Sequence, residues 1–213
     1  YFNYDRFDYK EEINSIHKSL VEEAVERNRG KAIQESQSKI MKYRSEIKYI
    51  ERNSERIKYM MNLIRKRFEK NENVLLLVHS IEYGATLCNV FSALLKDATY
   101  VRHIHGDIDL KEREDAISIM EKSTKCLIVA TSSIFSTGIS IKNLHTVMFG
   151  TPSKAKITVL QAIGRSLRLH DSKDCALVID LIDNLPYALK QSAERMNYYT
   201  SEKFDIHMLE VDL

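Results

Sequence analysis

The spacing of hydrophobic residues changes once along the chain, close to Val74. Before that point, apolar residues recur at intervals of three and four, which is typical of helices with one buried face. The pattern predicts helices over residues 8–29, 36–52 and 54–68, with Arg29 and Gly30 ending the first helix and Ser54 capping the third. The stripe in the third predicted helix consists of Ile57, Met60, Met61, Ile64 and Phe68.

After that point, short apolar runs alternate with segments of helical periodicity. A continuous run such as Val74–Val78 suits a strand that is buried on both faces of a parallel sheet. Strands are predicted over 74–78, 100–104, 126–130, 145–149 and 176–181. Helices are predicted around 87–95, from Asp109 as the cap through Met120, over 156–168, and from Pro186 to about Lys203. Alternating strands and helices indicate an α/β fold with right-handed crossovers, so we expect a helical segment over residues 1–70 and a parallel-sheet domain over 71–213 that ends in a helix.

Composition narrows the class of protein. The chain has 213 residues, of which 44% are hydrophobic and 29% charged, so a buried core is expected. Cys88, Cys126 and Cys175 lie far apart within apolar patterns, which indicates buried thiols in a reducing compartment rather than disulfides or a zinc site. No apolar run approaches the ~20 residues of a membrane span. Because the sequence begins with Tyr1, it can be a fragment of a longer protein.

Charge is distributed unevenly. Residues 31–70 hold twelve Lys and Arg against five Glu, a local net of +7, whereas residues 1–26 have a local net of −4. A basic block of this kind is either the solvated face of a helix or a track for nucleic acid. The sequence leaves both interpretations open.

Polar residues follow three of the predicted strands. They are His79–Ser80, His105–Gly106–Asp107 and Thr131–Ser132–Ser133. In an open parallel sheet, ligands gather beyond the carboxyl ends of the strands, so hydroxyl groups and backbone amides at these positions would suit phosphates. The alternative is that they are ordinary helix caps and turns. His105 is not expected to bind a metal, because no partner ligand stands at a suitable spacing.

The predicted helix over 156–168 carries the most specific pattern. Gln161, Gly164, Arg165 and Arg168 have the spacing Gln-x-x-Gly-Arg-x-x-Arg, which places the glutamine and both arginines near one helix face. Planar, permanently charged guanidinium groups suit a phosphate chain. The alternative is a pair of ordinary surface arginines.

These segments together resemble motifs V and VI of superfamily-2 helicases and translocases. Motif V is similar to the stretch FSTGISIKNL at residues 135–144, which also resembles the bacteriophage UvsW type of recombination helicase, and motif VI is similar to the Gln161–Arg168 pattern. The resemblance extends from about Val74 to the C-terminus. It implies that the sheet is the second RecA-like domain of such an enzyme.

The resemblance also implies roles for individual residues. Arg165 and Arg168 would be arginine fingers that reach the γ-phosphate of ATP held by another lobe, and Gln161 would lie near the same phosphates. Gly138 and Ser140 would lie near the nucleotide. In many relatives an Asp at the second position contacts the ribose, whereas this chain carries Ser140 there. Nucleic-acid contacts would come from His79, Ser80, His105, Gly106, Thr131 and Ser132.

The sequence contains no Gly-x-x-x-x-Gly-Lys-[Ser/Thr] motif and no acidic tetrad after a strand. ATP and Mg²⁺ would therefore be bound mainly by an N-terminal RecA-like lobe upstream, and the isolated chain is expected to be inactive as an ATPase. The complete enzyme would be a cytoplasmic DNA helicase of recombination and repair that acts on branched DNA and R-loops, in the host cell if a phage encodes it. The alternative is a RecA-like nucleic-acid-binding module without ATPase activity. A small-molecule enzyme lacks support, because no Rossmann glycine pattern or nucleophile–base pair is found.

Overall fold

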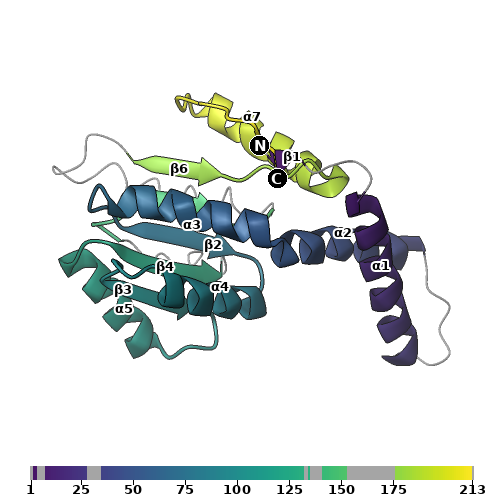
Figure 1. The fold of residues 1–213 in the computed structure, drawn as a ribbon, viewed down its shortest axis with the longest axis horizontal. Helices are drawn as coiled ribbons and strands as arrows, with labels where there is room; N and C mark the ends of the chain where they lie inside the picture. The colour runs from purple at the N-terminus through teal and green to yellow at the C-terminus, as the bar shows by residue number, and fades with distance from the viewer. Residues whose placement is uncertain are drawn as a thin grey trace. The chain divides into compact units, whose positions relative to one another are not determined.

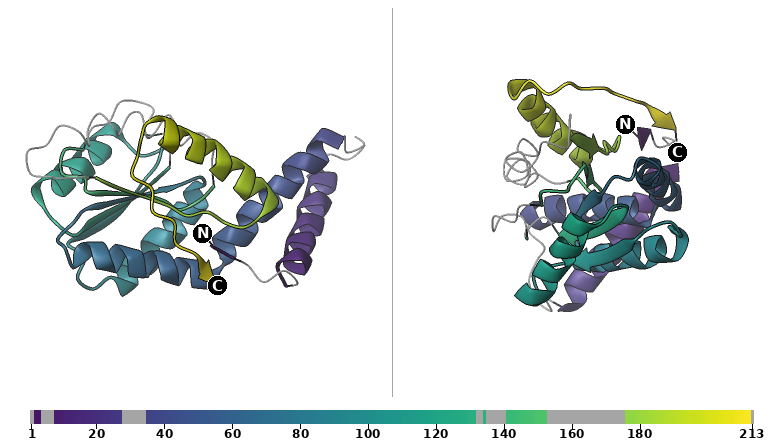
Figure 2. Two further views of the ribbon diagram at one scale, coloured as in Figure 1. Left: turned by 90° about the horizontal axis from the view of Figure 1, so that it is seen from above. Right: turned by 90° about the vertical axis from the view of Figure 1, so that its left-hand side faces the viewer.

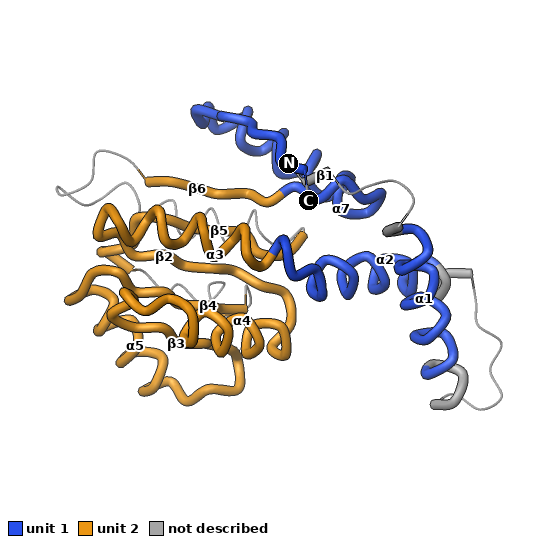
Figure 3. Tube along the Cα trace, in the orientation of Figure 1, with its two compact units in different colours: residues 1–56, 182–213 blue, residues 57–181 orange. Residues whose placement is uncertain are grey.

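The structure of the protein is a computed structural model that describes residues 2–3, 8–27, 35–131, 134, 141–152 and 176–212. The chain forms two compact units, one of Tyr1–Arg56 with Ile182–Leu213 and one of Ile57–Leu181 (Figure 3). In this division residues 57–70 belong with the sheet. The domain boundary that the sequence places after residue 70 stays a prediction.

The second unit is built on a five-stranded sheet in which every strand is parallel to its neighbours (Figures 1 and 2). The strand order is β3-β4-β2-β5-β6. The strands are β2 (Val74–Val78), β3 (Tyr100–Ile104), β4 (Cys126–Thr131), β5 (Thr146–Phe149) and β6 (Leu177–Asp180). The predicted α/β fold is therefore confirmed, and the central strands β2, β4 and β5 are buried along their whole length, as their continuous apolar runs indicated.

Three helices pack with this sheet: α3 (Ser54–Phe68), α4 (Ile81–Leu94) and α5 (Leu110–Lys122). Three residues of the predicted apolar stripe of α3, Met60, Ile64 and Phe68, are fully buried, whereas Ile57 and Met61 are half-buried. The chain crosses from β2 to β3 in one direction and returns to β4 in the other, so right-handed crossovers place α4 and α5 on opposite faces of the sheet. The predicted helix over 156–168 lies outside the described residues.

Two predicted helix caps differ from the structure. Ser54 is the first residue of α3, and the cap is Asn53, whose Oδ1 accepts a hydrogen bond of 2.8 Å from the amide of Arg56. Asn is as good a cap as Ser, and it occupies the break between the two helices one residue earlier. Asp109 precedes α5 as predicted, but its side chain makes no capping hydrogen bond.

The amino-terminal edge of the sheet is held by the side chain of Asn73, which is fully buried. Its Nδ2 donates to the carbonyl oxygens of Met120, Ser123 and Asn143 at 2.8–2.9 Å, and its Oδ1 accepts from the amide of Cys126 at 2.9 Å. One amide therefore links the start of β2 to the end of α5, the start of β4 and the segment before β5. A buried side-chain amide stabilises the fold only when its hydrogen bonds are made, as they are for Asn73.

The first unit contains α1 (Asp8–Arg27), α2 (Glu35–Arg52) and α7 (Pro186–Ser201), with α1 and α7 each in contact with α2. It also contains a pair of two-residue parallel strands, β1 (Phe2–Asn3) and β7 (Val211–Asp212). The sequence predicted the three helices but not this pair, because two residues are too few to show a period.

Glu46 on α2 caps the start of α7 within the first unit. Its Oε2 accepts hydrogen bonds from the amides of Tyr187 at 2.9 Å and Ala188 at 3.2 Å, whereas the residue before the helix, Leu185, offers no capping side chain. Burial raises the pKa of Glu46 from 4.5 to about 7, and the negative charge of Asp183 adds to the rise although the two amide hydrogen bonds oppose it. Glu46 therefore holds its proton in the folded chain at pH values where an unfolded chain has lost it.

Replacing Glu46 with Gln should make the chain more resistant to denaturation at about pH 8 than the wild type, with little difference at about pH 5. The raised pKa means that the folded state binds more protons than the unfolded state between pH 4.5 and about 7, so the free energy of unfolding falls as pH rises through this window. Gln keeps an oxygen for the two amides and cannot ionise. Urea denaturation of both proteins at the two pH values measures the effect.

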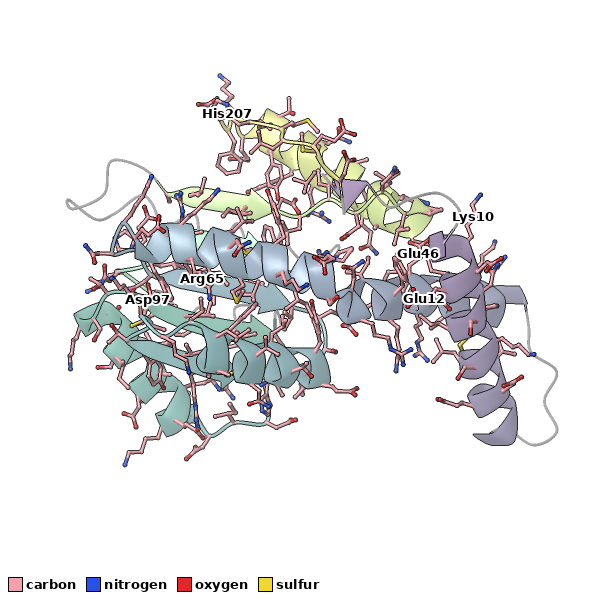
Figure 4. The ribbon with its side chains drawn as sticks, in the orientation of Figure 1. Lys10, Glu12, Glu46, Arg65, Asp97 and His207 are labelled. Atoms are coloured by element: carbon pink, nitrogen blue, oxygen red, sulfur yellow. The ribbon has the colours of Figure 1, made fainter. Side chains whose placement is uncertain are left out.

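The matched control is Glu12→Gln on the exposed surface of α1, which should leave the pH dependence as it is in the wild type. Figure 4 labels both glutamates. Equal pH dependence in the wild type and the Glu46→Gln variant would contradict the raised pKa.

Candidate nucleic-acid interface

The carboxyl ends of three neighbouring strands place the predicted contact residues along one edge of the sheet. Ile104 on β3 pairs with Ala130 on β4, so His105 and Thr131 lie next to each other along the edge. Thr131 pairs in turn with Val78 on β2, the residue before His79. Neighbouring strands are about 4.8 Å apart, so these three positions form a short row across β3, β4 and β2.

The two polar residues after β2, His79 and Ser80, fit different interpretations: Ser80 is a helix cap, and His79 is exposed. Ser80 is the N-cap of α4, and its Oγ accepts a hydrogen bond of 3.1 Å from the amide of Tyr83. Its hydroxyl therefore has a structural role. The side chain of His79 is exposed at the edge, where it is accessible to a ligand.

The turn after β3 is held by Arg113 from α5. The Nη2 atom of this arginine donates to the carbonyl oxygens of Gly106 at 3.0 Å and Ile108 at 2.9 Å, and the amide of Ile108 donates to the carbonyl of His105 at 3.2 Å. The turn is thus fixed by a charged donor, and such hydrogen bonds are stronger than those between neutral groups. Arg113 was not singled out from the sequence.

Gly106 is not required by the geometry of this turn. Its φ angle is not in the left-handed region, and a Cβ atom built on it would meet nothing within 4 Å. The tight-turn explanation for this glycine therefore lacks support. A bare backbone that faces open space remains suited to the close approach of a ligand.

Among the predicted contacts that the structure describes, Thr131 is the least accessible, with an exposed fraction of 5%. Its neighbour Ser132 lies outside the described residues. The contact of these two hydroxyls with a phosphate stays a prediction.

A second histidine lies behind His105. His103 is in β3 and His105 is the first residue after it, and their ring centroids are 4.9 Å apart at an interplanar angle of 38°. Burial, then the neighbouring His105 and Arg102, lower the pKa of His103. Arg102 forms an ion pair with Glu112 of α5. The alternation of two histidines at positions 103 and 105 was the signal that sequence reasoning missed.

A hollow of about 340 Å³ lies beside His103, between α4 and β3. Its lining combines small and polar residues of α4 with part of the edge strand: Ala85, Cys88, Asn89, Ser92, Val101, Arg102 and His103. Burial raises the pKa of the Cys88 thiol, so this cysteine is a poor nucleophile.

Within the second unit, the basic residues at the end of α3 do not continue this edge. The last turn of α3 precedes β2, so its arginines lie toward the amino-terminal edge, where Arg65 Nη2 donates to the carbonyl of Leu94 at 3.1 Å. Arg67 lies 3.7 Å from Glu72. Arg56 is buried in an ion pair with Asp183 in the first unit. Arg65 and Arg67 therefore have partners within the protein, and the burial of Arg56 fits neither a solvated helix face nor a nucleic-acid track.

The remaining predicted site residues lie outside the described residues. They are Gly138, Ser140, Gln161, Gly164, Arg165 and Arg168. Their predicted roles toward ATP stay predictions. Among the described residues, no group of three or more His, Cys, Asp or Glu side chains could hold a metal ion. In the same part of the chain, no helix combines the length and apolar character that a membrane span needs.

A parallel sheet of this order, with helices on both faces, is the RecA-like fold, and the pattern of the helicase conserved C-terminal domain family matches residues 55–170. The chain belongs to this family, which confirms the resemblance read from motifs V and VI. It is similar to the ATP-dependent DNA helicase UvsW of Enterobacteria phage T4, with 34% identity over 94% of this chain and 41% of that protein.

Solved structures agree with this assignment. The crystal structure of T4 UvsW superposes with a TM-score of 0.66 and 32% identity, over 89% of this chain and 39% of that one. The SWI2/SNF2 ATPase core domain of Sulfolobus solfataricus has a TM-score of 0.64 at 14% identity, over 95% of this chain and 43% of that one, and so shares the fold. The chain spans less than half the length of these relatives.

Proposed function

We propose that this chain is the C-terminal motor lobe of an ATP-dependent DNA helicase that unwinds or branch-migrates branched DNA and R-loops. The observation that supports it most directly is the row of His105, Thr131 and His79 at the carboxyl edge of a RecA-like sheet. The similarity to a phage ATP-dependent DNA helicase adds to it. The lobe would hold the nucleic-acid backbone on this edge.

The two sets of predicted residues would divide the work of the lobe. His79, Ser80, His105, Gly106, Thr131 and Ser132 would contact the nucleic acid. Gly138, Ser140, Gln161, Arg165 and Arg168 would face ATP and Mg²⁺ bound mainly by an upstream lobe. Closure of the two lobes on ATP, and opening after hydrolysis, would alternate their hold on the strand and give directional movement.

Replacing Gly106 with Ala should weaken binding of single-stranded DNA by the 213-residue chain roughly tenfold, the equivalent of about 1.4 kcal/mol. The added methyl group would occupy the space that a phosphate needs for close approach to the backbone. The free energy of unfolding should not fall, because the Cβ meets no atom within 4 Å. Fluorescence anisotropy with a short labelled oligonucleotide, at two salt concentrations, measures the affinity and its salt dependence.

The control is Thr99→Ala, a small change at an exposed position in the loop before β3, at the opposite edge of the sheet. It should leave affinity unchanged. If Gly106→Ala binds as tightly as the wild type, the nucleic acid does not approach this backbone. The alternative function, a binding module without ATPase activity, predicts the same DNA-binding results. The two functions differ in Arg165, which would act in ATP hydrolysis only in the motor lobe.

A further inference from the structure

Two imidazole nitrogens at the end of β3 are buried without a hydrogen-bond partner, His103 Nε2 and His105 Nδ1. The nearest acidic atom to the second, Asp107 Oδ2, is 3.8 Å away, which is beyond hydrogen-bonding distance. A buried polar atom without a partner destabilises the fold, so apolar rings at these positions would be at least as stable. Packing alone therefore does not account for a pair of histidines here.

The ring of His103 fits against a glycine of α4. A Cβ atom on Gly84 would lie 2.3 Å from His103 Nε2 and 2.8 Å from Cδ2, closer than any side chain could tolerate. Gly84 is itself buried in the first turn of the helix. The ring of His103 thus packs against α4 at Gly84, and the ring of His105 lies 4.9 Å from it.

The charges around the pair favour an uncharged His103. Burial, His105 and Arg102 all lower the pKa of His103. The positive charge of Arg102 is directed to Glu112 of α5, and Arg113 is occupied with two backbone carbonyls of the turn. A neutral ring can stack against His105 without repelling it.

We propose that His103 is a positioning residue that holds the imidazole of His105 at the carboxyl edge of the sheet, ready to contact the backbone of a bound DNA strand. The proposal rests on the proposed function of this edge. His103 supports the ring of His105 from the α4 side, and Arg113 fixes the backbone of the turn from the α5 side. A side chain that is ordered before binding loses less conformational freedom when the ligand arrives, so affinity increases.

The test is a double-mutant cycle on DNA binding by the 213-residue chain, measured with a labelled single-stranded oligonucleotide. His105→Ala should weaken binding roughly tenfold, and His103→Ala about three- to fivefold. The double variant should bind no more weakly than His105→Ala alone, because His103 acts only through His105. His103→Phe should restore most of the affinity, since it keeps a flat ring in contact with His105.

Each outcome discriminates between the two proposals. Absence of measurable binding by the wild type, or full affinity in His105→Ala, overturns the proposed contact at this edge and the role of His103 with it. If His105→Ala weakens binding but His103→Ala does not, only the positioning role fails. If His103→Ala causes the same loss with or without His105, its role is merely structural and the inference is also wrong.

A measurement without DNA tests the same stacking. The ring protons of His105 should show a ring-current shift from His103 in the NMR spectrum of the wild type. That shift should disappear in His103→Ala and persist in His103→Phe. Identical His105 ring signals in all three proteins would overturn the proposal.

Discussion

Under the proposed function, replacing Arg165 with Ala in the complete protein is expected to reduce ATP hydrolysis by about 10³- to 10⁵-fold while ATP still binds. Negative charge develops on the phosphoryl oxygens in the transition state, and an arginine finger stabilises it more there than in the bound ground state. The predicted loss therefore lies in turnover. Steady-state hydrolysis in the presence of DNA, together with equilibrium binding of a fluorescent ATP analogue, separates the two effects.

Two further variants sharpen this result. Arg165→Lys keeps the charge but lacks the planar guanidinium group with its paired N–H donors, so it should recover only a small part of the activity. Arg44→Ala removes an exposed arginine of α2 and should leave hydrolysis unchanged. Normal turnover by Arg165→Ala would remove the finger assignment and favour the binding-module alternative.

Replacing Arg56 with Ala should lower the free energy of unfolding by about 3–5 kcal/mol. Arg56 Nε donates to Asp183 Oδ1 at 2.7 Å and Nη2 donates to Oδ2 at 3.0 Å, and both side chains are fully buried. Alanine would leave the carboxylate of Asp183 buried without its main partner, close to the buried Glu46. Urea denaturation monitored by circular dichroism measures the loss.

Removing both charges should lower the free energy of unfolding much less than removing one. A double variant, Arg56→Met with Asp183→Leu, takes away the buried ion pair and replaces it with apolar side chains, a change that is often close to neutral in other proteins. The exposed control Arg44→Ala should change stability by less than about 0.5 kcal/mol. A double variant that is less stable than Arg56→Ala would show that the polar contacts of this pair contribute more than their burial costs.

The central strands β2, β4 and β5 could be predicted because they are buried on both faces. In β2 the predicted and observed ends coincide at Val74 and Val78, and β5 begins one residue later than predicted. A continuous apolar run bounded by polar residues leaves little freedom in where a strand begins. The helix starts were less certain, since Asn53 and Ser54 are both good caps and only the folded chain shows which one is used.

The contacts that hold the fold together could not be predicted. Glu46 caps a helix that begins 140 residues later in the chain, and Arg56 pairs with a carboxylate 127 residues away. Each of these residues has the polar character of an exposed helix face in the sequence. No local period distinguishes a charged residue that faces solvent from one that meets a distant partner.

The candidate site was predicted in part, by the rule that ligands bind at the carboxyl ends of parallel strands. This rule identified His79, His105 and Thr131, and the strand order places them side by side. It could not identify His103 or Arg113, because they act from within β3 and from α5. Their roles depend on packing against Gly84 and on two backbone carbonyls, which only the three-dimensional structure shows.

The hydrogen bonds of Asn73 have a consequence for how this fold can diversify. They secure the amino-terminal edge of the sheet from a side chain that no ligand needs to touch. Loops at the other edge are then not needed to hold the strands in register. Substitutions in those loops are therefore expected to change what the edge binds while the stability of the sheet changes little.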